Sequence, residues 1–127
     1  MHPSIAKITD SELEVLRILW EAGRELPMAE IRASLERSSR WDSSTIKTLL
    51  RRLCEKGAVL AEKQDVFYYK PLVSEKEYND YTTQSLIDRL YAGSAKSLVA
   101  SLLGGNKLND ADLAELRMLL KEEDKDA

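Results

Sequence analysis

The sequence predicts a mainly α-helical protein that carries one small β-hairpin. Six stretches place apolar residues three and four positions apart, which is the spacing of a buried stripe on an α-helix. Between the third and fourth stretches, over residues 59–70, two short runs rich in β-branched and aromatic residues replace that period. With 127 residues, 43% of them hydrophobic, the chain has the size of one ordinary domain or of a small domain with an appendage.

The first two helices have recognisable ends. Thr9 and Glu12 match a capping box, so the first helix should begin there, and it should end at Gly23. The second is short, because it opens at Pro27, which suits a first helical turn, and fades at residues 38–39. The apolar faces of these two helices carry Leu13, Val15, Leu16, Ile18, Leu19 and Trp20, and then Ile31 and Leu35.

The third helix has two faces of different character. It should start at Asp42 or Ser43, either of which can cap a helix, and stop at Gly57. Its apolar face consists of Ile46, Leu49, Leu50, Leu53 and Cys54. The opposite face carries only hydroxyls and cations: Ser43, Ser44, Thr45, Lys47, Thr48, Arg51 and Arg52. A surface that is only solvated would usually mix charges of both signs to gain ion pairs. The interpretation of this face as a solvated surface nevertheless stays open.

After the third helix, residues 59–63 and 66–70 predict a hairpin closed by Gln64 and Asp65. Pro71 should close the sheet edge, since it cannot donate to a ladder. Tyr68 and Tyr69 alternate, so one should face the core and the other the outside, depending on the register.

Three helices followed by a hairpin is the order of a winged helix-turn-helix domain, which we expect over residues 1–73. In such domains the last helix enters the major groove of double-stranded DNA. We therefore predict that the seven polar residues of the third helix bind DNA. Ser44, Thr45 and Thr48 are short enough to read base edges, and the cations can reach phosphate or guanine.

The charges are unevenly placed, although the net charge is only -3. Residues 37–63 hold seven cations and three carboxylates, a local charge of +4. From residue 74 onward the count is seven cations against eleven carboxylates, a charge of -4. A local basic patch can steer a protein towards a polyanion while the remainder keeps the protein in solution.

The sequence contains few residues or motifs that indicate redox, membrane, catalytic or metal-binding functions. Cys54 is the only cysteine, and its place in an apolar stripe favours a core residue over an oxidant sensor. We find no signal peptide, no apolar run near the roughly 20 residues of a membrane span, and no disulfide framework, so we expect a cytoplasmic protein without membrane insertion. With no glycine-rich phosphate loop, Ser/His/Asp set or metal-ligand cluster, we expect neither an enzyme nor a cofactor.

Three further helices are predicted over residues 74–127. Ser74 and Glu77 form a capping box for the first, which Gly93 stops; the second ends at residues 104–105; the third starts at Asn109 and should fray over the charged residues 121–127. These helices have little chain with which to cover their apolar faces, so we expect a homodimerisation region, with folding back onto the winged domain as the alternative. A two-fold dimer would bind a palindromic operator whose half-sites are a multiple of about ten base pairs apart. The expected dimer contacts are Tyr81, Leu86, Leu90, Tyr91, Leu98, Val99, Leu102, Leu113, Leu116 and Leu120.

Four segments carry a family resemblance: LEVLRILW (13–20), WDSSTIKTLLRRL (41–53), FYYK (67–70) and LYAGSAKSLV (90–99). They resemble the penicillinase repressors, the BlaI/MecI/CopY group of bacterial transcriptional regulators. The resemblance runs from about Ile8 to Leu120. It implies a dimeric winged-helix repressor that occupies operator DNA near its own promoter, of the kind that regulates antibiotic resistance. In β-lactamase systems of this family, a membrane-bound sensor metalloprotease triggers cleavage of the repressor in its dimerisation region. The matching bond here joins Ser101 and Leu102.

The sequence departs from the family pattern at two places. Residues 42–44 read Asp-Ser-Ser where the family often has Ser-Pro-Lys, so a hydroxyl replaces a cation and the operator sequence should differ. The chain ends LKEEDKDA without the Cys-x-Cys pair of the copper-sensing branch, which excludes Cu(I) sensing through that site. The alternative function is a winged-helix module for protein–protein interaction whose basic patch is incidental.

Overall fold

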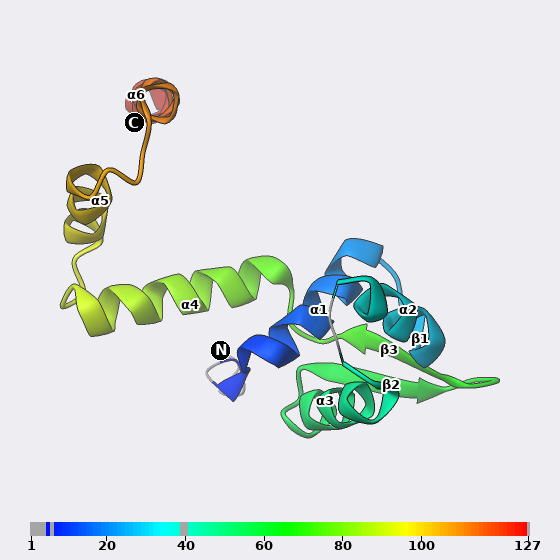
Figure 1. The fold of residues 1–127 in the computed structure, drawn as a ribbon. Helices are drawn as coiled ribbons and strands as arrows, with labels where there is room; N and C mark the ends of the chain where they lie inside the picture. Colours follow the sequence, from blue (N-terminus) through cyan, green and yellow to red (C-terminus); the bar gives the residue numbers. More distant parts are fainter. Residues whose placement is uncertain (1–4, 6, 39–40, 127) are drawn as a thin grey trace. The chain divides into compact units, whose positions relative to one another are not determined.

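A computed structural model describes residues 5, 7–38 and 41–126 of the chain. It contains a three-stranded sheet and six helices within the described residues (Figure 1). The chain forms two compact units, residues 1–83 and 84–127, and the boundary falls within the fourth helix. The elements are α1 (Asp10–Ala22), β1 (Leu26–Pro27), α2 (Met28–Ser38), α3 (Ser43–Glu55), β2 (Val59–Lys63), β3 (Phe67–Pro71), α4 (Glu75–Leu90), α5 (Ala95–Gly104) and α6 (Asp110–Asp126).

The N-terminal unit has a closed hydrophobic core built from the predicted helix faces. Leu13 and Trp20 stay partly exposed at its edge, and the indole Nε1 of Trp20 donates to the Val73 carbonyl at 2.9 Å. Removing a leucine or isoleucine from water stabilises the fold by about 1.5–3 kcal/mol, so this core accounts for most of the unit's stability. Three helices contribute fully buried side chains: Val15, Leu16 and Leu19 of α1, Ile31 and Leu35 of α2, and Ile46, Leu50 and Leu53 of α3.

The predicted ends of the first and third helices are confirmed. The Thr9 hydroxyl accepts the Glu12 amide at 3.2 Å, while the Glu12 carboxylate accepts the Thr9 amide at 2.9 Å, which completes the capping box of α1. Asp42 rather than Ser43 caps α3. Gly23 and Gly57 follow α1 and α3 with φ of 66° and 76°, a left-handed conformation that glycine adopts without steric cost.

The sheet differs from the prediction in three details. Pro27 lies not in a first helical turn but in the unpredicted strand β1, which pairs with β3 through Leu26↔Tyr69 and Pro27↔Tyr68. Strand β3 starts at Phe67 instead of Val66, because Lys63 pairs with Phe67 and leaves Val66 in the turn. Pro71 belongs to β3, opposite Val59. The N–H that proline lacks would point towards β1, but β1 pairs only with Tyr68 and Tyr69, so no hydrogen bond of the sheet is lost.

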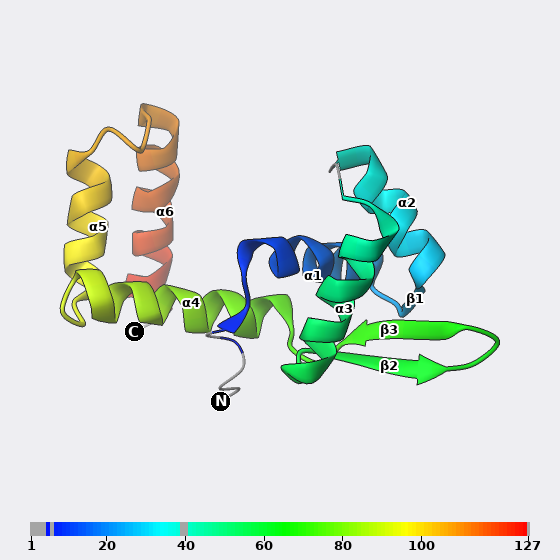
Figure 2. The same cartoon turned by 60° about the horizontal axis from the view of Figure 1, so that its bottom comes forward.

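The register decides the orientation of the aromatic residues around the sheet. Tyr69 packs against the core, and burial raises the pKa of its hydroxyl, whereas Tyr68 points to the other face of the sheet. Trp41, directly before α3, is half-buried and also packs against the core. Figure 2 shows the β2–β3 hairpin as an arm whose turn projects beyond the helices of this unit.

The C-terminal unit has well-formed helices and few buried side chains. Asn109 and Asp112 exchange backbone and side-chain hydrogen bonds at the start of α6. The same exchange between Ser74 and Glu77 caps α4, whose first half belongs to the N-terminal unit. The prediction that the last helix frays from residue 121 is wrong for residues 121–126, because α6 continues to Asp126. Lysine and glutamate are good helix formers. Ala127 lies outside the described residues. Among the described residues of this unit, Ile87 is the only buried hydrophobic residue. No described helix is both long and apolar enough to cross a membrane.

Candidate nucleic-acid interface

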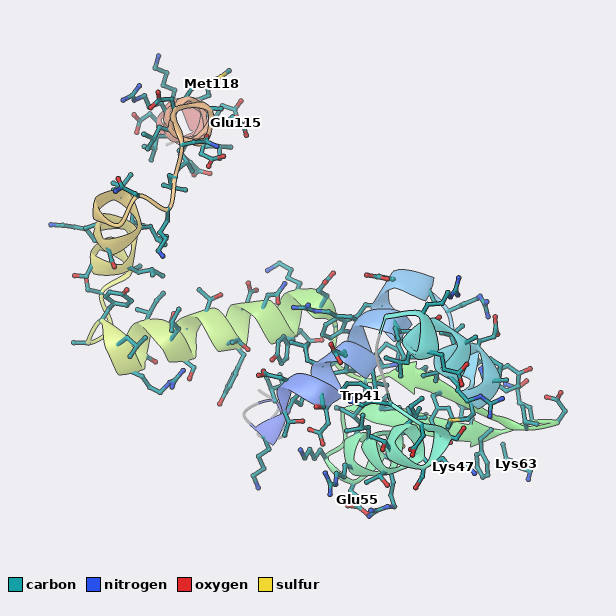
Figure 3. The ribbon with its side chains drawn as sticks, viewed as in Figure 1. Trp41, Lys47, Glu55, Lys63, Glu115 and Met118 are labelled. Carbon is teal, nitrogen blue, oxygen red and sulfur yellow. The ribbon has the colours of Figure 1, made fainter. Side chains whose placement is uncertain are left out.

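The polar face of α3 lies at the surface of the N-terminal unit. Its orientation is fixed because Ile46, Leu49, Leu50 and Leu53 on the opposite side are all buried. Figure 3 shows Lys47 and Glu55 on this helix. Of the seven residues proposed to bind DNA, Ser44, Thr45, Lys47, Arg51 and Arg52 are exposed, and Ser43 and Thr48 are half-buried.

The C-terminal end of α3 is tied to α1. The ammonium group of Lys56, next to the last residue of the helix, donates to the Glu12 carboxylate and to the Lys7 carbonyl, both at 2.5 Å. Glu12 is fully buried, and the Lys56 side chain is only 22% exposed. A partly buried ion pair of this kind costs desolvation energy but fixes one geometry, and here that geometry is the angle between α3 and α1.

The first two turns of α3 carry four hydroxyl groups, which differ in their hydrogen bonds. The Asp42 carboxylate accepts the Thr45 amide at 2.8 Å, and this backbone hydrogen bond lowers the pKa of Asp42. The Thr48 hydroxyl donates to the Ser44 carbonyl at 3.1 Å within the helix. Ser43 accepts from Arg32 of α2 at 3.3 Å. The Thr45 side chain also hydrogen-bonds to the Asp42 carboxylate. Of these four hydroxyls, that of Ser44 therefore has the fewest partners in the described structure.

The cations of α3 are not equally available. Arg51 forms an ion pair with Glu55 at 3.0 Å, but both side chains are 61% exposed, and such surface pairs contribute little. Neither Lys47 nor Arg52 forms an ion pair with any residue that the structure describes. Arg40, a further cation of the basic patch, lies outside the described residues.

Two cations near this face were not among the predicted site residues. Arg32 lies on α2, and its guanidinium reaches Ser43 at the start of α3. Lys63 ends β2, and its ammonium group lies 5.0 Å from the centre of the Phe67 ring. The local sequence does not mark Arg32, since its position beside α3 depends on how the helices pack. Lys63 belongs to the basic stretch 37–63 that the sequence indicated.

The residues predicted for dimerisation lie mostly on open helix surfaces. Tyr81 differs, because it packs against the core of the N-terminal unit. The α5 and α6 helices flank an apolar groove of about 450 Å³ that includes Val99, Leu116 and Leu120. Ser101 and Leu102 lie inside α5, and the Ser101 hydroxyl accepts from the Tyr91 hydroxyl at 3.1 Å. Of the predicted set, Leu90, Val99, Leu102, Leu116 and Leu120 are exposed, and Leu86, Tyr91, Leu98 and Leu113 are half-buried.

The described residues were also compared with the requirements of a metal site and of a reactive thiol. No group of three or more His, Cys, Asp or Glu side chains among them could hold a metal ion. Cys54 is half-buried, and burial raises the pKa of its thiol, with Glu55 adding to the effect. A raised pKa lowers the reactivity of a thiol, in agreement with the role of a packing residue.

Comparison with known proteins gives a consistent result. The family described as Penicillinase repressor matches residues 8–122. The penicillinase repressor of Bacillus licheniformis is 34% identical over 119 residues, which cover 93% of this chain and 92% of that protein. The methicillin resistance regulatory protein MecI of Staphylococcus aureus strain N315 is 29% identical over 117 residues, covering 91% of this chain and 94% of the relative.

Two solved structures resemble the N-terminal part of the chain. The solution structure of the DNA-binding domain of the repressor BlaI has a TM-score of 0.53 and 37% identity, covering 58% of this chain and 90% of that one. The monomeric form of Bacillus licheniformis BlaI, in complex with the blaP half-operator, has a TM-score of 0.50 and 38% identity, covering 56% of this chain and 87% of that one.

Proposed function

Because the chain belongs to the penicillinase repressor family, we propose that it represses transcription by binding operator DNA through the polar face of α3. The observation that carries this proposal is the outward face of α3, where exposed hydroxyls and cations stand on a helix anchored by four buried residues. The chain is a DNA-binding transcriptional repressor, and we place its activity in the cytoplasm and expect no catalytic activity.

The roles within the interface follow from the geometry of the side chains. Ser44 and Thr45 stand exposed in the first turn of α3, the part of a recognition helix that faces base edges. Lys47 and Arg52 carry charges that no described carboxylate neutralises, which suits contacts with phosphate. Arg51 can exchange its exposed partner Glu55 for phosphate at little cost.

We also propose that two copies pair through the C-terminal unit. The exposed leucines on α5 and α6 and the groove between them favour a second copy of the chain as the cover. Pairing places two recognition helices on one palindromic operator, and two modest half-site contacts then act as one strong contact.

Release of the operator by cleavage is a further part of the proposal. The Ser101–Leu102 bond lies within α5, a helix of only ten residues. A protease binds an extended backbone, so a sensor protease would have to unwind this helix first, and a helix of that length is marginal by itself. Cutting there would separate α6 from the DNA-binding unit and remove the benefit of pairing.

A mobility-shift assay tests the function. At about 150 mM salt, DNA from upstream of the protein's own gene should bind at least ~10³ times more tightly than unrelated DNA. Equal retardation of both DNAs would contradict the repressor and leave the protein-interaction module as the better explanation.

Substitutions in α3 test the assignment of roles. Lys47→Ala should weaken binding to every sequence and flatten the dependence on salt, because a phosphate contact carries no sequence information. Thr45→Ala and Ser44→Ala should change the preferred sequence more than the overall affinity. The same loss on all sequences from all three variants would show that the base-reading positions are wrong.

A further inference from the structure

One buried carboxylate connects the recognition helix to the rest of the N-terminal unit. Among the described residues, Glu12 is the only buried polar or charged side chain, and it has no exposed surface. Its Oε1 atom accepts the Thr9 amide at 2.9 Å and the Lys56 ammonium group at 2.5 Å. The same ammonium group donates to the Lys7 carbonyl at 2.5 Å. We call these two hydrogen bonds from Lys56 the Lys56 anchor, which joins the end of α3 to α1 and to the segment before α1.

The Lys56 anchor is an inefficient way to stabilise the fold. Burial takes a carboxylate and an ammonium group out of water, and their attraction offsets this cost only when their remaining polar atoms also find partners. The Oε2 atom of Glu12 is buried and has no hydrogen-bond partner in the part of the chain that the structure describes. The leucines on the apolar face of α3 are buried as well, and they account for the stability of its packing.

The anchor instead supplies direction. Apolar contacts are non-directional, so the buried leucines decide which face of α3 turns inwards but allow the helix to tilt on its neighbours. A hydrogen bond between charged groups requires a short distance and a narrow range of angles. At the opposite end of α3, the hydrogen bond from Arg32 to Ser43 is exposed and 3.3 Å long. The tilt of α3 is therefore set mainly at its C-terminal end.

The first turn of α3 is sensitive to this tilt because it lies far from the anchor. Ser44 precedes Lys56 by twelve residues, which is roughly 18 Å of helix, so a tilt of about 3° moves Ser44 by about 1 Å. A hydroxyl on a short side chain cannot follow a base edge over that distance. The long side chains of Lys47 and Arg52 can still reach a phosphate.

We propose that Glu12 and Lys56 are positioning residues that set how well the repressor discriminates between DNA sequences, without touching DNA themselves. The inference rests on the proposed function and adds two residues outside the polar face of α3. Loss of the anchor lowers the preference for operator DNA, whereas the affinity for unrelated DNA and the stability of the fold stay nearly the same.

Two variants that differ only at residue 56 isolate the anchor. The first is Glu12→Gln, whose amide oxygen can still accept the Thr9 amide, as in other capping boxes, and the Lys56 ammonium group. The second combines Glu12→Gln with Lys56→Met, which removes the ammonium group without leaving an unpaired buried charge. Lys76→Met is the control for the loss of one cation, because Lys76 pairs with Asp80 at 2.6 Å where their side chains are 85% and 65% exposed.

The test measures the affinity of each full-length variant for DNA from upstream of its own gene and for unrelated DNA, at several salt concentrations. Denaturant unfolding shows that each variant is folded in the assay. Glu12→Gln should keep the ratio of the two affinities within about threefold of wild type. The double variant should lower that ratio by about tenfold per half-site, the order of discrimination that one base pair carries. Its affinity for unrelated DNA, its salt slope and its unfolding midpoint should match those of Lys76→Met.

Four results would overturn the inference. An unchanged ratio in the double variant would show that the anchor only supports the fold, and an equal loss in Glu12→Gln would show that the ammonium group is not what positions α3. A salt slope about 0.9 smaller than that of Lys76→Met would make Lys56 a phosphate contact. A double variant that is unfolded in the assay would show that stability depends on the anchor. Failure of the wild type to prefer its upstream DNA would instead overturn the proposed function, so the two failures are distinct.

Discussion

The two units of this chain use similar helices in opposite ways. In the N-terminal unit, the apolar stripes of α1, α2 and α3 meet, and Leu16, Ile31 and Ile46 are fully buried. In the C-terminal unit, the stripes of α5 and α6 remain open, with Leu103 51% and Leu120 66% exposed. Apolar periodicity alone therefore predicts a helix, whereas burial depends on whether a second surface is present to cover it. The first unit supplies its own cover, and we expect the second to obtain it from another copy.

The largest effect should come from disrupting the proposed contact between two copies at the apolar groove of α5 and α6. Leu120 lines the apolar groove, so Leu120→Asp should abolish pairing and weaken binding to a two-half-site operator by about 10²–10⁴-fold. Binding to a single half-site should not change. Mobility shifts on the two duplexes measure both values.

Met118 provides the control for that substitution. It is as exposed as Leu120, at 65%, and belongs to the same helix, but it does not line the groove. Met118→Asp should therefore keep operator binding near the wild-type value. Equal losses from both variants would indicate a damaged helix instead of a lost interface.

The next effect concerns the closed core. Leu50→Ala should lower the free energy of unfolding of the N-terminal unit by about 2–5 kcal/mol, since it empties a fully packed position. Leu119→Ala, at a position 56% exposed in α6, should change that free energy by less than about 1 kcal/mol. The two tryptophans of the chain, Trp20 and Trp41, both lie in the N-terminal unit, so fluorescence during denaturant unfolding reports on it. Similar losses from both substitutions would contradict the contrast between the units.

The smallest effect should be a pH dependence at the cap of α3. Hydrogen bonding to Thr45 lowers the pKa of Asp42 from its ordinary value of 3.8. A lowered pKa means that the ionised group stabilises the fold above the ordinary pKa and that this contribution disappears as the pH falls through the folded-state pKa. The melting temperature of wild type should therefore exceed that of Asp42→Asn near pH 6, and the gap should shrink between about pH 5 and pH 2. A gap that is constant with pH would show that the charge plays no part.

Much of the fold could be predicted because its signals are local. The capping box of Thr9 and Glu12 and the glycines after α1 and α3 act within one helical turn, and the structure confirms them. Strand β1 could not be predicted, because two residues become a strand only through pairing with Tyr68 and Tyr69, some forty positions away.

The same distinction applies to the site. The polar face of α3 is visible in the sequence because residues three and four apart share one side of a helix. Arg32 was not found, since it comes from another helix and approaches α3 only after packing. Tyr81 was one of the expected dimer contacts, yet it packs against the core of the first unit. Periodicity gives the direction of a side chain but not the surface that it meets.

Sedimentation equilibrium of the full-length wild-type chain at micromolar concentration tests most directly whether a second copy covers α5 and α6. We expect a species with twice the mass of one chain, and Leu120→Asp should sediment with the mass of a single chain. A wild-type chain that sediments as a monomer would contradict the account, because its exposed leucines would then need another explanation.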